Sequence, residues 1–175
     1  MVIFIATMEN AKQTCIQMLT QRGYEEILTN DENNITARKK NDNIIVFFDD
    51  QPKLNKGLIS KYMSIMKDEN ISHSIIIYND SVTNMTNKSV EQSLEMNIEL
   101  FCVDELQFNI TQHRLQPKKF RILSKEENNK FRKTFTSKIP IMKYLDPIRR
   151  FYNFNAGDII EITDRRDIVS YRIVK

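Results

Sequence analysis

The sequence has 175 residues and a formal net charge of +3, with 41% hydrophobic and 28% charged residues. These fractions predict a soluble globular protein that can build a core. No run approaches the roughly 20 apolar residues that span a bilayer, so we expect no membrane partner. Only three glycines are present, Gly23, Gly57 and Gly157. They stand too far apart for a glycine-rich phosphate loop or a G-x-S-x-G turn, which argues against nucleotide-binding folds of those kinds.

Charge is divided unevenly along the chain. Residues 1–110 contain 10 Lys and Arg against 16 Asp and Glu, a net charge of −6, and residues 111–175 contain 16 against 7, a net charge of +9. Such a split predicts two domains with different partners. The basic half suits nucleic acid or an acidic protein surface, and a solvated basic face explains it equally well.

The cysteines and the start of the chain indicate the compartment. Cys15 and Cys102 suit a reducing compartment, and we expect both to be buried, inert thiols. Residues 1–6 are apolar but have no basic leader and are too short for a secretory signal. We therefore expect the chain to stay inside a cell.

The first half of the chain alternates predicted helices with short apolar runs. Apolar side chains recur at helical spacing over residues 3–22, and Gly23 ends that helix. Residues 29–43 are polar and predict a loop with a weak strand at 35–37. Further on, the pattern predicts buried strands at 44–48, 74–78 and 98–102, separated by helices around 58–66 and at 85–96. This order predicts a small α/β domain with a partly parallel sheet.

The junction between the halves is less regular. Residues 103–117 fit either an extended segment or a helix that Asp104 would cap. Ser124 begins a helix, because Glu127 follows three residues later as in a capping box.

The last 37 residues contain a short helix followed by a predicted hairpin. Asp146 can cap the helix, and Pro147 suits its first position. Asn153 sits where a helix ends in a left-handed residue, which Asn tolerates. Two runs rich in β-branched residues, 159–163 and 168–174, flank a polar turn. A helix on a hairpin buries little surface alone, so this unit requires another surface to pack on.

Residue types that carry catalysis are scattered. His73 and His113 stand alone, and neither cysteine has a C-x-x-C partner, so we predict no zinc site and no cofactor. Asp50 and Lys53 suggest a metal-dependent nuclease, but their spacing is wrong for one. No serine–histidine or cysteine–histidine pair stands out. The sequence therefore argues against an enzyme that acts alone.

Clustered cations make the second half a candidate for phosphate contacts. The candidates are Lys118, Lys119, Arg121, Arg149, Arg150, Arg165 and Arg166. Single-strand binding also needs exposed aromatic rings for stacking. Phe151, Tyr152 and Phe154 lie near two of these arginines, and we interpret them as core anchors of the short helix.

The motifs of the second half together resemble a small component of multisubunit RNA polymerases. This component is the fifth subunit shared by the three nuclear polymerases, which has a shorter archaeal counterpart. Residues 146–152 (DPIRRFY), 157–162 (GDIIEI) and 171–174 (YRIV) resemble its D-P-V-A-R-Y, G-x-V-V-x-I and closing Y-R. Residues 113–118 (HRLQPK) and 122–127 (ILSKEE) are similar to its H-x-L-x-P-K and I-L-S-x-E-E.

The resemblance continues into the first half, which the archaeal counterpart lacks. Residues 17–24 (QMLTQRGY) resemble the Q-M-L-x-x-R-G-Y of the eukaryotic jaw domain, and residues 105–113 resemble its E-L-L-I-N-I-T-x-H. The chain departs from the family at Asn153, where a glycine is usual, and at its shortened last hairpin. Residues 83–86 (TNMT) stand where the family has a T-P-S-A tip.

The resemblance implies an α+β fold. An N-terminal α/β jaw domain (residues 1–109) would hold a small mixed sheet, and a C-terminal α+β assembly domain (residues 110–175) would set short helices on a sheet that contains a β-hairpin. It also implies a non-catalytic subunit of a DNA-directed RNA polymerase, with no active site, cofactor or small-molecule ligand of its own. Its partners would be the largest and other polymerase subunits, and its jaw would line the downstream duplex DNA in transcription.

The resemblance also assigns residues to these roles. Partner docking falls to His113, Pro117, Asp146, Pro147, Arg149, Arg150, Tyr152, Gly157, Tyr171 and Arg172. The DNA-proximal tip comprises Thr83, Asn84, Thr86, Asn87 and Lys88.

Two other functions and two compartments stay open. A stand-alone DNA-binding transcription regulator is the alternative that the basic half favours, and a nuclease is the third hypothesis. The many Asn, Ile and Lys residues suggest an AT-rich genome, and a large DNA virus is one candidate source. We expect the nucleus if the chain is cellular, and the host cytoplasm or virion if it is viral.

Overall fold

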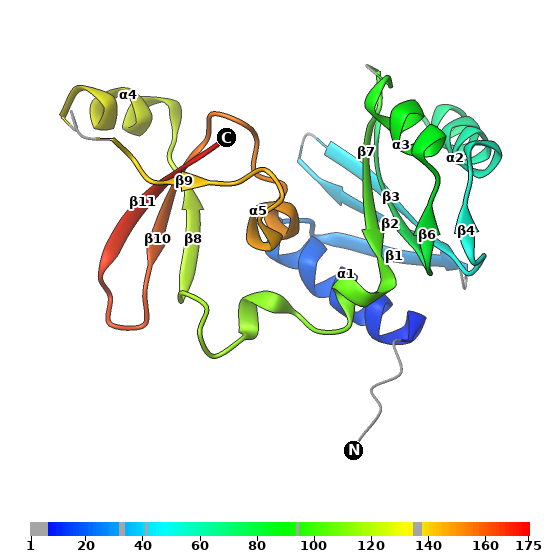
Figure 1. Ribbon diagram of the computed structural model, residues 1–175, viewed down its shortest axis with the longest axis horizontal. Helices are drawn as coiled ribbons and strands as arrows, with labels where there is room; N and C mark the ends of the chain where they lie inside the picture. Colours follow the sequence, from blue (N-terminus) through cyan, green and yellow to red (C-terminus); the bar gives the residue numbers. More distant parts are fainter. Residues whose placement is uncertain (1–6, 32–33, 41, 94, 135–137) are drawn as a thin grey trace. The chain divides into compact units, whose positions relative to one another are not determined.

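The computed structural model describes residues 7–31, 34–40, 42–93, 95–134 and 138–175. The chain forms two compact units, Met1–Phe108 and Asn109–Lys175, which we call the N-terminal and C-terminal units. Both contain helices packed on a β-sheet (Figure 1), which confirms the predicted mixture of α and β structure. Within the described segments, no helix combines the length and apolar character needed to cross a membrane.

The N-terminal unit is built on a five-stranded mixed sheet. Its strand order is β1-β2-β3-β5-β7, in which β1, β2 and β3 are antiparallel neighbours and β3, β5 and β7 run parallel. The elements are α1 (Met8–Gln21), β1 (Glu26–Asp31), β2 (Asn34–Lys39), β3 (Asp42–Asp49), β4 (Lys53–Leu54), α2 (Lys56–Asp68), β5 (His73–Tyr78), β6 (Ser81–Val82), α3 (Asn84–Glu91), β7 (Asn97–Cys102) and the 3₁₀ turn η1 (Val103–Leu106).

Helices cover both faces of the central strands, which explains their continuous apolar runs. Ile45 and Phe47 of β3 and Ile76 of β5 pack with the buried side chains of α2, and α3 lies beside α2 (Figure 1). The alternate β3 residues point to the opposite face, where the ammonium group of Lys12 in α1 lies 5.4 Å from the centre of the Phe48 ring.

A buried charged network ties α1 to the sheet. The Arg22 guanidinium donates two hydrogen bonds, of 2.7 and 2.9 Å, to the Glu99 carboxylate on β7. The same carboxylate lies 2.9 Å from Nε2 of His73 on β5, and Nδ1 of His73 lies 3.2 Å from Asp42. The side chains of Arg22 and Glu99 are only 4% and 12% exposed, so the pair that holds α1 in place is largely shielded from water.

The predictions for this unit need partial correction. The weak strand predicted at 35–37 is confirmed as part of β2, but the residues before it form β1, which pairs with β2 as an antiparallel hairpin where a loop was expected. Such outer strands keep one face in water, which allows polar residues and weakens the apolar signal. The first helix begins at Met8, where the Thr7 hydroxyl accepts the Asn10 N–H at 3.2 Å. The predicted helical residues 3–6 lie outside the described residues.

The C-terminal unit is built on a four-stranded sheet in the order β8-β10-β11-β9. Its elements are the 3₁₀ turn η2 (Ile110–Gln112), β8 (Lys119–Ile122), α4 (Lys125–Thr134), β9 (Ile141–Met142), α5 (Pro147–Tyr152), β10 (Ile159–Thr163) and β11 (Val169–Val174). The hairpin of β10 and β11 is as predicted. Strands β8 and β9 were not predicted, and η1 and η2 settle the ambiguous stretch 103–117 as two short turns of helix.

The two helices of this unit cover opposite faces of its sheet (Figure 1). Ile148 of α5 packs with Ile160 and Ile162 of β10. Phe131 of α4 packs on Ile159, one position along β10, and therefore on the other face. The unit thus has a small cluster of apolar side chains on each side of the sheet.

The predicted start and end of α5 are confirmed. Asp146 Oδ1 accepts the N–H groups of Ile148 and Arg149 at 2.9 and 3.4 Å, and Pro147 occupies the first helical turn. Asn153 ends the helix in the left-handed region with φ 53° and ψ 46°. The chain therefore makes its turn without the usual glycine.

Candidate functional site

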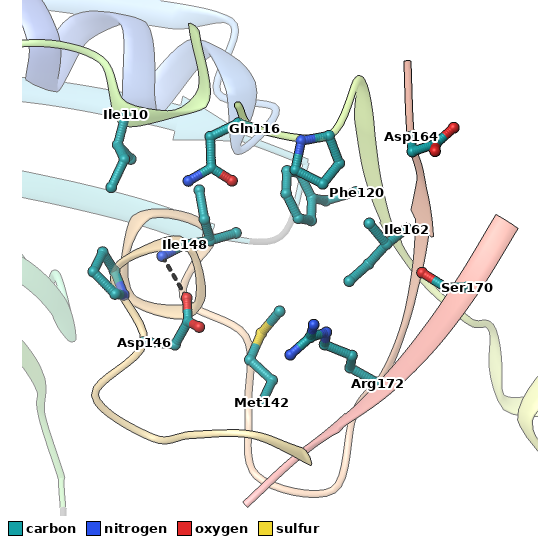
Figure 2. A pocket seen from close by; sticks show the side chains of 12 residues that line it. Ile110, Gln116, Phe120, Met142, Asp146, Ile148, Ile162, Asp164, Ser170 and Arg172 are labelled. Atoms are coloured by element: carbon teal, nitrogen blue, oxygen red, sulfur yellow. Dashed lines mark hydrogen bonds between the residues drawn. The ribbon is translucent and has the colours of Figure 1, made fainter. Parts of the chain in front are cut away.

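Four residues predicted to dock a partner line one pocket of the C-terminal unit. They are Pro117, Asp146, Pro147 and Arg172, and the pocket has a volume of about 330 Å³. Its other walls are Ile110, Gln116, Phe120, Met142, Ile148, Ile162, Asp164 and Ser170 (Figure 2). The structure thus brings together residues that are 55 positions apart in the sequence, from Pro117 to Arg172.

The floor of the pocket is the apolar cluster beneath α5. Met142, Ile148 and Ile162 are 3%, 5% and 6% exposed, and all belong to that cluster together with the partly buried Phe120. In Figure 2 their side chains point toward a common space. An apolar group that enters the pocket would therefore extend the core of the unit.

The rim of the pocket is polar, and its acids already have partners. Asp146 Oδ1 accepts the N–H groups at the start of α5, one of them drawn in Figure 2. Asp164 Oδ1 accepts the N–H groups of Arg166 and Ile168 at 2.7 and 2.8 Å in the hairpin turn. The side chain of Arg172, in contrast, makes no hydrogen bond or ion pair with any residue that the structure describes. An unpaired guanidinium is thus available at the rim.

Exposed apolar and aromatic side chains lie in the segment before α5. Tyr144 and Leu145 are 56% and 78% exposed, and Ile141 is 51% exposed. The Arg149 guanidinium lies 4.0 Å from the centre of the Tyr144 ring, and its buried Nε has no hydrogen-bond partner among the described atoms. Tyrosine and arginine are enriched at the centres of protein interfaces. Sequence reasoning missed Tyr144 and Leu145, although two apolar residues directly before a helix cap were a visible signal.

The other residues predicted to dock are placed differently. Tyr152 belongs to the aromatic cluster under α5, with its ring 5.2 Å from that of Phe154. Tyr171 points to the opposite face of the sheet from Arg172 and packs against Phe131 at 4.5 Å. These two tyrosines support the unit and do not line the pocket.

The remaining members of the predicted set lie at turns and in α5. His113 is exposed after η2, and its carbonyl oxygen accepts a hydrogen bond from Arg165 at 3.3 Å. Gly157 turns the chain before β10 with φ 92°, where its N–H donates to Val174. Arg150 lies half-buried in α5.

Several cations proposed for phosphate contacts are engaged within the chain. Arg121 forms ion pairs with Glu161 at 3.0 Å and with Glu127 at 2.8 Å. Its hydrogen bonds, followed by one from the Ser124 backbone, lower the pKa of Glu127 to about 2. Lys118 pairs with Asp167 at 3.0 Å. The positive charge of this unit is therefore partly neutralised locally.

The predicted DNA-proximal tip is the start of α3. The Thr83 hydroxyl accepts the Thr86 N–H at 3.1 Å and so caps the helix. Thr86 is itself fully buried, so its side chain holds the tip together and does not face solvent. Asn84, Asn87 and Lys88 are exposed.

Reactive groups do not gather into a metal site in the part of the chain that the structure describes, where no three His, Cys, Asp or Glu side chains are grouped to hold an ion. Asp50 directly follows β3, Lys53 begins β4, and both side chains are exposed. Cys15 is buried as expected, and burial raises its pKa to about 12. Cys102 is only partly buried, so the expectation of two buried thiols is correct for Cys15 alone.

Comparison with known proteins covers both units. Residues 108–174, nearly the whole C-terminal unit, match the family described as "RNA polymerase Rpb5, C-terminal domain". The chain is 32% identical to "Putative DNA-directed RNA polymerase subunit 454R" of Invertebrate iridescent virus 6, over 91% of this chain and 95% of the viral protein. It is 30% identical to "DNA-directed RNA polymerases I, II, and III subunit rpabc1" of Dictyostelium discoideum, over 86% of each chain.

A more distant relative agrees with these two. "DNA-directed RNA polymerase V subunit 5A" of Arabidopsis thaliana is 26% identical over 93% of this chain and 84% of its own length. The resemblance inferred from the motifs is confirmed by these matches. The chain belongs to the Rpb5 family of DNA-directed RNA polymerase subunits.

Proposed function

We propose that this non-catalytic polymerase subunit docks through its C-terminal unit on the largest subunit of its polymerase and lines the downstream DNA with its N-terminal unit. The relatives are named as polymerase subunits, which implies other polymerase subunits as partners. We further propose that the chain has no active site of its own and contributes to assembly.

The observation that supports docking most strongly is the surface of the C-terminal unit. Eleven large hydrophobic side chains are exposed among the described residues, and seven of them belong to this smaller unit. They are Leu115, Ile122, Ile141, Tyr144, Leu145, Ile168 and Val169. Exposed apolar groups favour a protein interface where they gather, as Ile141, Tyr144 and Leu145 do in the segment before α5. The net charge of +9 favours an acidic partner surface.

The placement of the N-terminal unit beside DNA rests on the resemblance of residues 83–86 to the family's tip. Asn84, Asn87 and Lys88 are exposed there and can contact a backbone phosphate. The unit as a whole has a net charge of −6, so we expect weak DNA binding by the isolated chain. Positioning by the rest of the polymerase would then keep DNA near this unit.

The compartment follows the polymerase. A viral relative supports a large DNA virus as one source, in which case we propose the host cytoplasm or virion. In a cellular source we propose the nucleus, because the motifs resemble the subunit shared by the three nuclear polymerases and the Dictyostelium relative is named for polymerases I, II and III.

The test is co-expression of the full chain with the largest subunit of its own polymerase, followed by measurement of their association. Asp146→Ala combined with Pro147→Gly removes the cap and first-turn proline of α5, a loss of about 1 kcal/mol or more. We expect this double variant to weaken association more than any contact with DNA. Ser124→Ala is the matched control, because it removes the cap of α4 on the other face of the sheet.

Two outcomes would contradict the proposal. One is a wild-type chain that stays monomeric when the largest subunit is present. The other is strong, salt-sensitive binding of duplex DNA by the chain alone, which would instead favour the DNA-binding regulator.

A further inference from the structure

The pocket beneath α5 combines an apolar floor with a single unpaired charge at its rim. Met142 and Ile162 in the floor are nearly inaccessible to water, yet they face an opening of about 330 Å³. That volume lies near the low end of the range of about 300–1,000 Å³ for ligand clefts. It suits one or two side chains from an extended segment and is too small for a folded element.

The charges at the rim decide what kind of group enters. Asp146 and Asp164 are held by backbone N–H groups of their own turns. Arg172 has no such partner among the described residues, and in Figure 2 its guanidinium extends toward Met142 and the middle of the pocket. A guanidinium pairs best with a planar carboxylate, which it can bind through two hydrogen bonds.

The same rim disfavours nucleic acid. A phosphate backbone carries a charge at every nucleotide, and here it would meet the carboxylates of Asp146 and Asp164 on either side of Arg172. A single carboxylate on a protein segment can reach Arg172 and avoid both acids. Phe120, the aromatic side chain that lines the pocket, is partly buried, and its ring centre already lies 5.7 Å from that of Tyr152, which leaves little of the ring for stacking on a base.

We propose that this pocket binds an extended segment of the largest polymerase subunit, in which a large apolar side chain fills the space above Met142 and Ile162 and a neighbouring Asp or Glu pairs with Arg172. The inference rests on the proposed docking of the C-terminal unit and identifies the chemistry of the segment that docks. When the segment binds, its carboxylate supplies the partner that the Arg172 guanidinium lacks within the chain. Its apolar side chain completes the cluster under α5.

Two variants of the full chain test the pocket, with association to the co-expressed largest subunit as the readout. Arg172→Glu places a third carboxylate at the rim, and we expect it to raise the Kd by about tenfold or more. Its control is Lys125→Glu, which makes the same change of charge at an exposed position in the first turn of α4, where an acid is tolerated. Ser170→Trp fills the opening from an exposed position and should weaken association, whereas Ser170→Ala should not.

A photo-crosslinking residue at position 170 then identifies the segment. We expect crosslinks to one stretch of the largest subunit that has a large apolar residue next to an acidic residue. Replacing that acidic residue by Arg should restore binding to the Arg172→Glu variant. If the wild-type chain does not associate at all, the proposed docking function fails. If it associates but Arg172→Glu binds as tightly as Lys125→Glu, the pocket inference is overturned and the docking function stands. Loss of duplex-DNA binding alone in Arg172→Glu would also overturn the pocket inference.

Discussion

Replacing Arg22 by methionine tests how the N-terminal unit holds α1 on its sheet. The substitution removes both hydrogen bonds from the guanidinium to the Glu99 carboxylate and leaves that carboxylate 12% exposed without its main partner. Breaking one side of a buried ion pair typically costs about 3–5 kcal/mol. Because His73 stays 2.9 Å from the same carboxylate, we expect the lower end, about 3 kcal/mol. That loss is a large part of the free energy of unfolding of a typical domain, which is roughly 5–15 kcal/mol.

The double variant Arg22→Met with Glu99→Leu separates desolvation from attraction. Apolar residues of similar size in place of a buried pair are often neutral or stabilising. We therefore expect the double variant to be clearly more stable than Arg22→Met alone.

The assay must resolve the two units, because a chain of two compact units does not have to unfold in a single two-state transition. Amide hydrogen exchange in β5 and β7 reports the N-terminal unit, and exchange in β10 and β11 is the internal control and should not change. A loss below about 1 kcal/mol for Arg22→Met would refute the reasoning, since exposed ion pairs contribute that little. So would a double variant no more stable than the single one.

Three further predictions follow from single groups. Burial raises the pKa of Glu99, but the charge of Arg22 and the hydrogen bond from His73 outweigh burial and hold that pKa below 4.5. The ionised Glu99 therefore contributes its full stabilisation of the fold above pH 4.5, and this contribution is lost as the pH falls through the lower pKa of the folded state. Glu99→Gln should make the stability measured by urea unfolding depend less on pH in this acid range. Asn153→Gly should leave stability within about 1 kcal/mol, whereas Asn153→Val should cost about 1–2 kcal/mol in the left-handed region, measured by exchange in α5. Cys15 is fully buried, and burial raises its pKa to about 12, whereas Cys102, whose pKa burial also raises, is partly accessible. A thiol reagent should therefore modify native Cys102 first, and equal rates would contradict this.

Local chemistry made parts of the fold predictable. The acceptor oxygen of Asp146, the missing N–H of Pro147 and the tolerance of Asn153 for positive φ act within a few residues, so the bounds of α5 followed from sequence. The apolar runs of β3 and β5 were visible because helices bury both faces of those strands. Family membership followed from the order of several short motifs along the chain, because no single one of these motifs is specific enough alone.

Strands with one wet face or few residues were not predictable in the same way. Strand β8 is recognised by its pairing with β10, about 40 positions away, where Arg121 lies opposite Glu161. Strand β9 has two residues and exists only through its parallel pairing with β11. No local periodicity encodes such partners, because their hydrogen bonds join distant segments.

The sequence by itself determined where α5 begins and ends, which runs are buried and to which family the chain belongs. Only the tertiary structure decided that Arg172 faces the pocket while its neighbour Tyr171 faces α4, since the side chains of a strand alternate and the register with β10 selects the face. It also brought Pro117, Asp146 and Arg172 to one rim. The physical reason is that capping and turn preferences are local free energies, whereas a pocket forms only when distant segments pack on a common core.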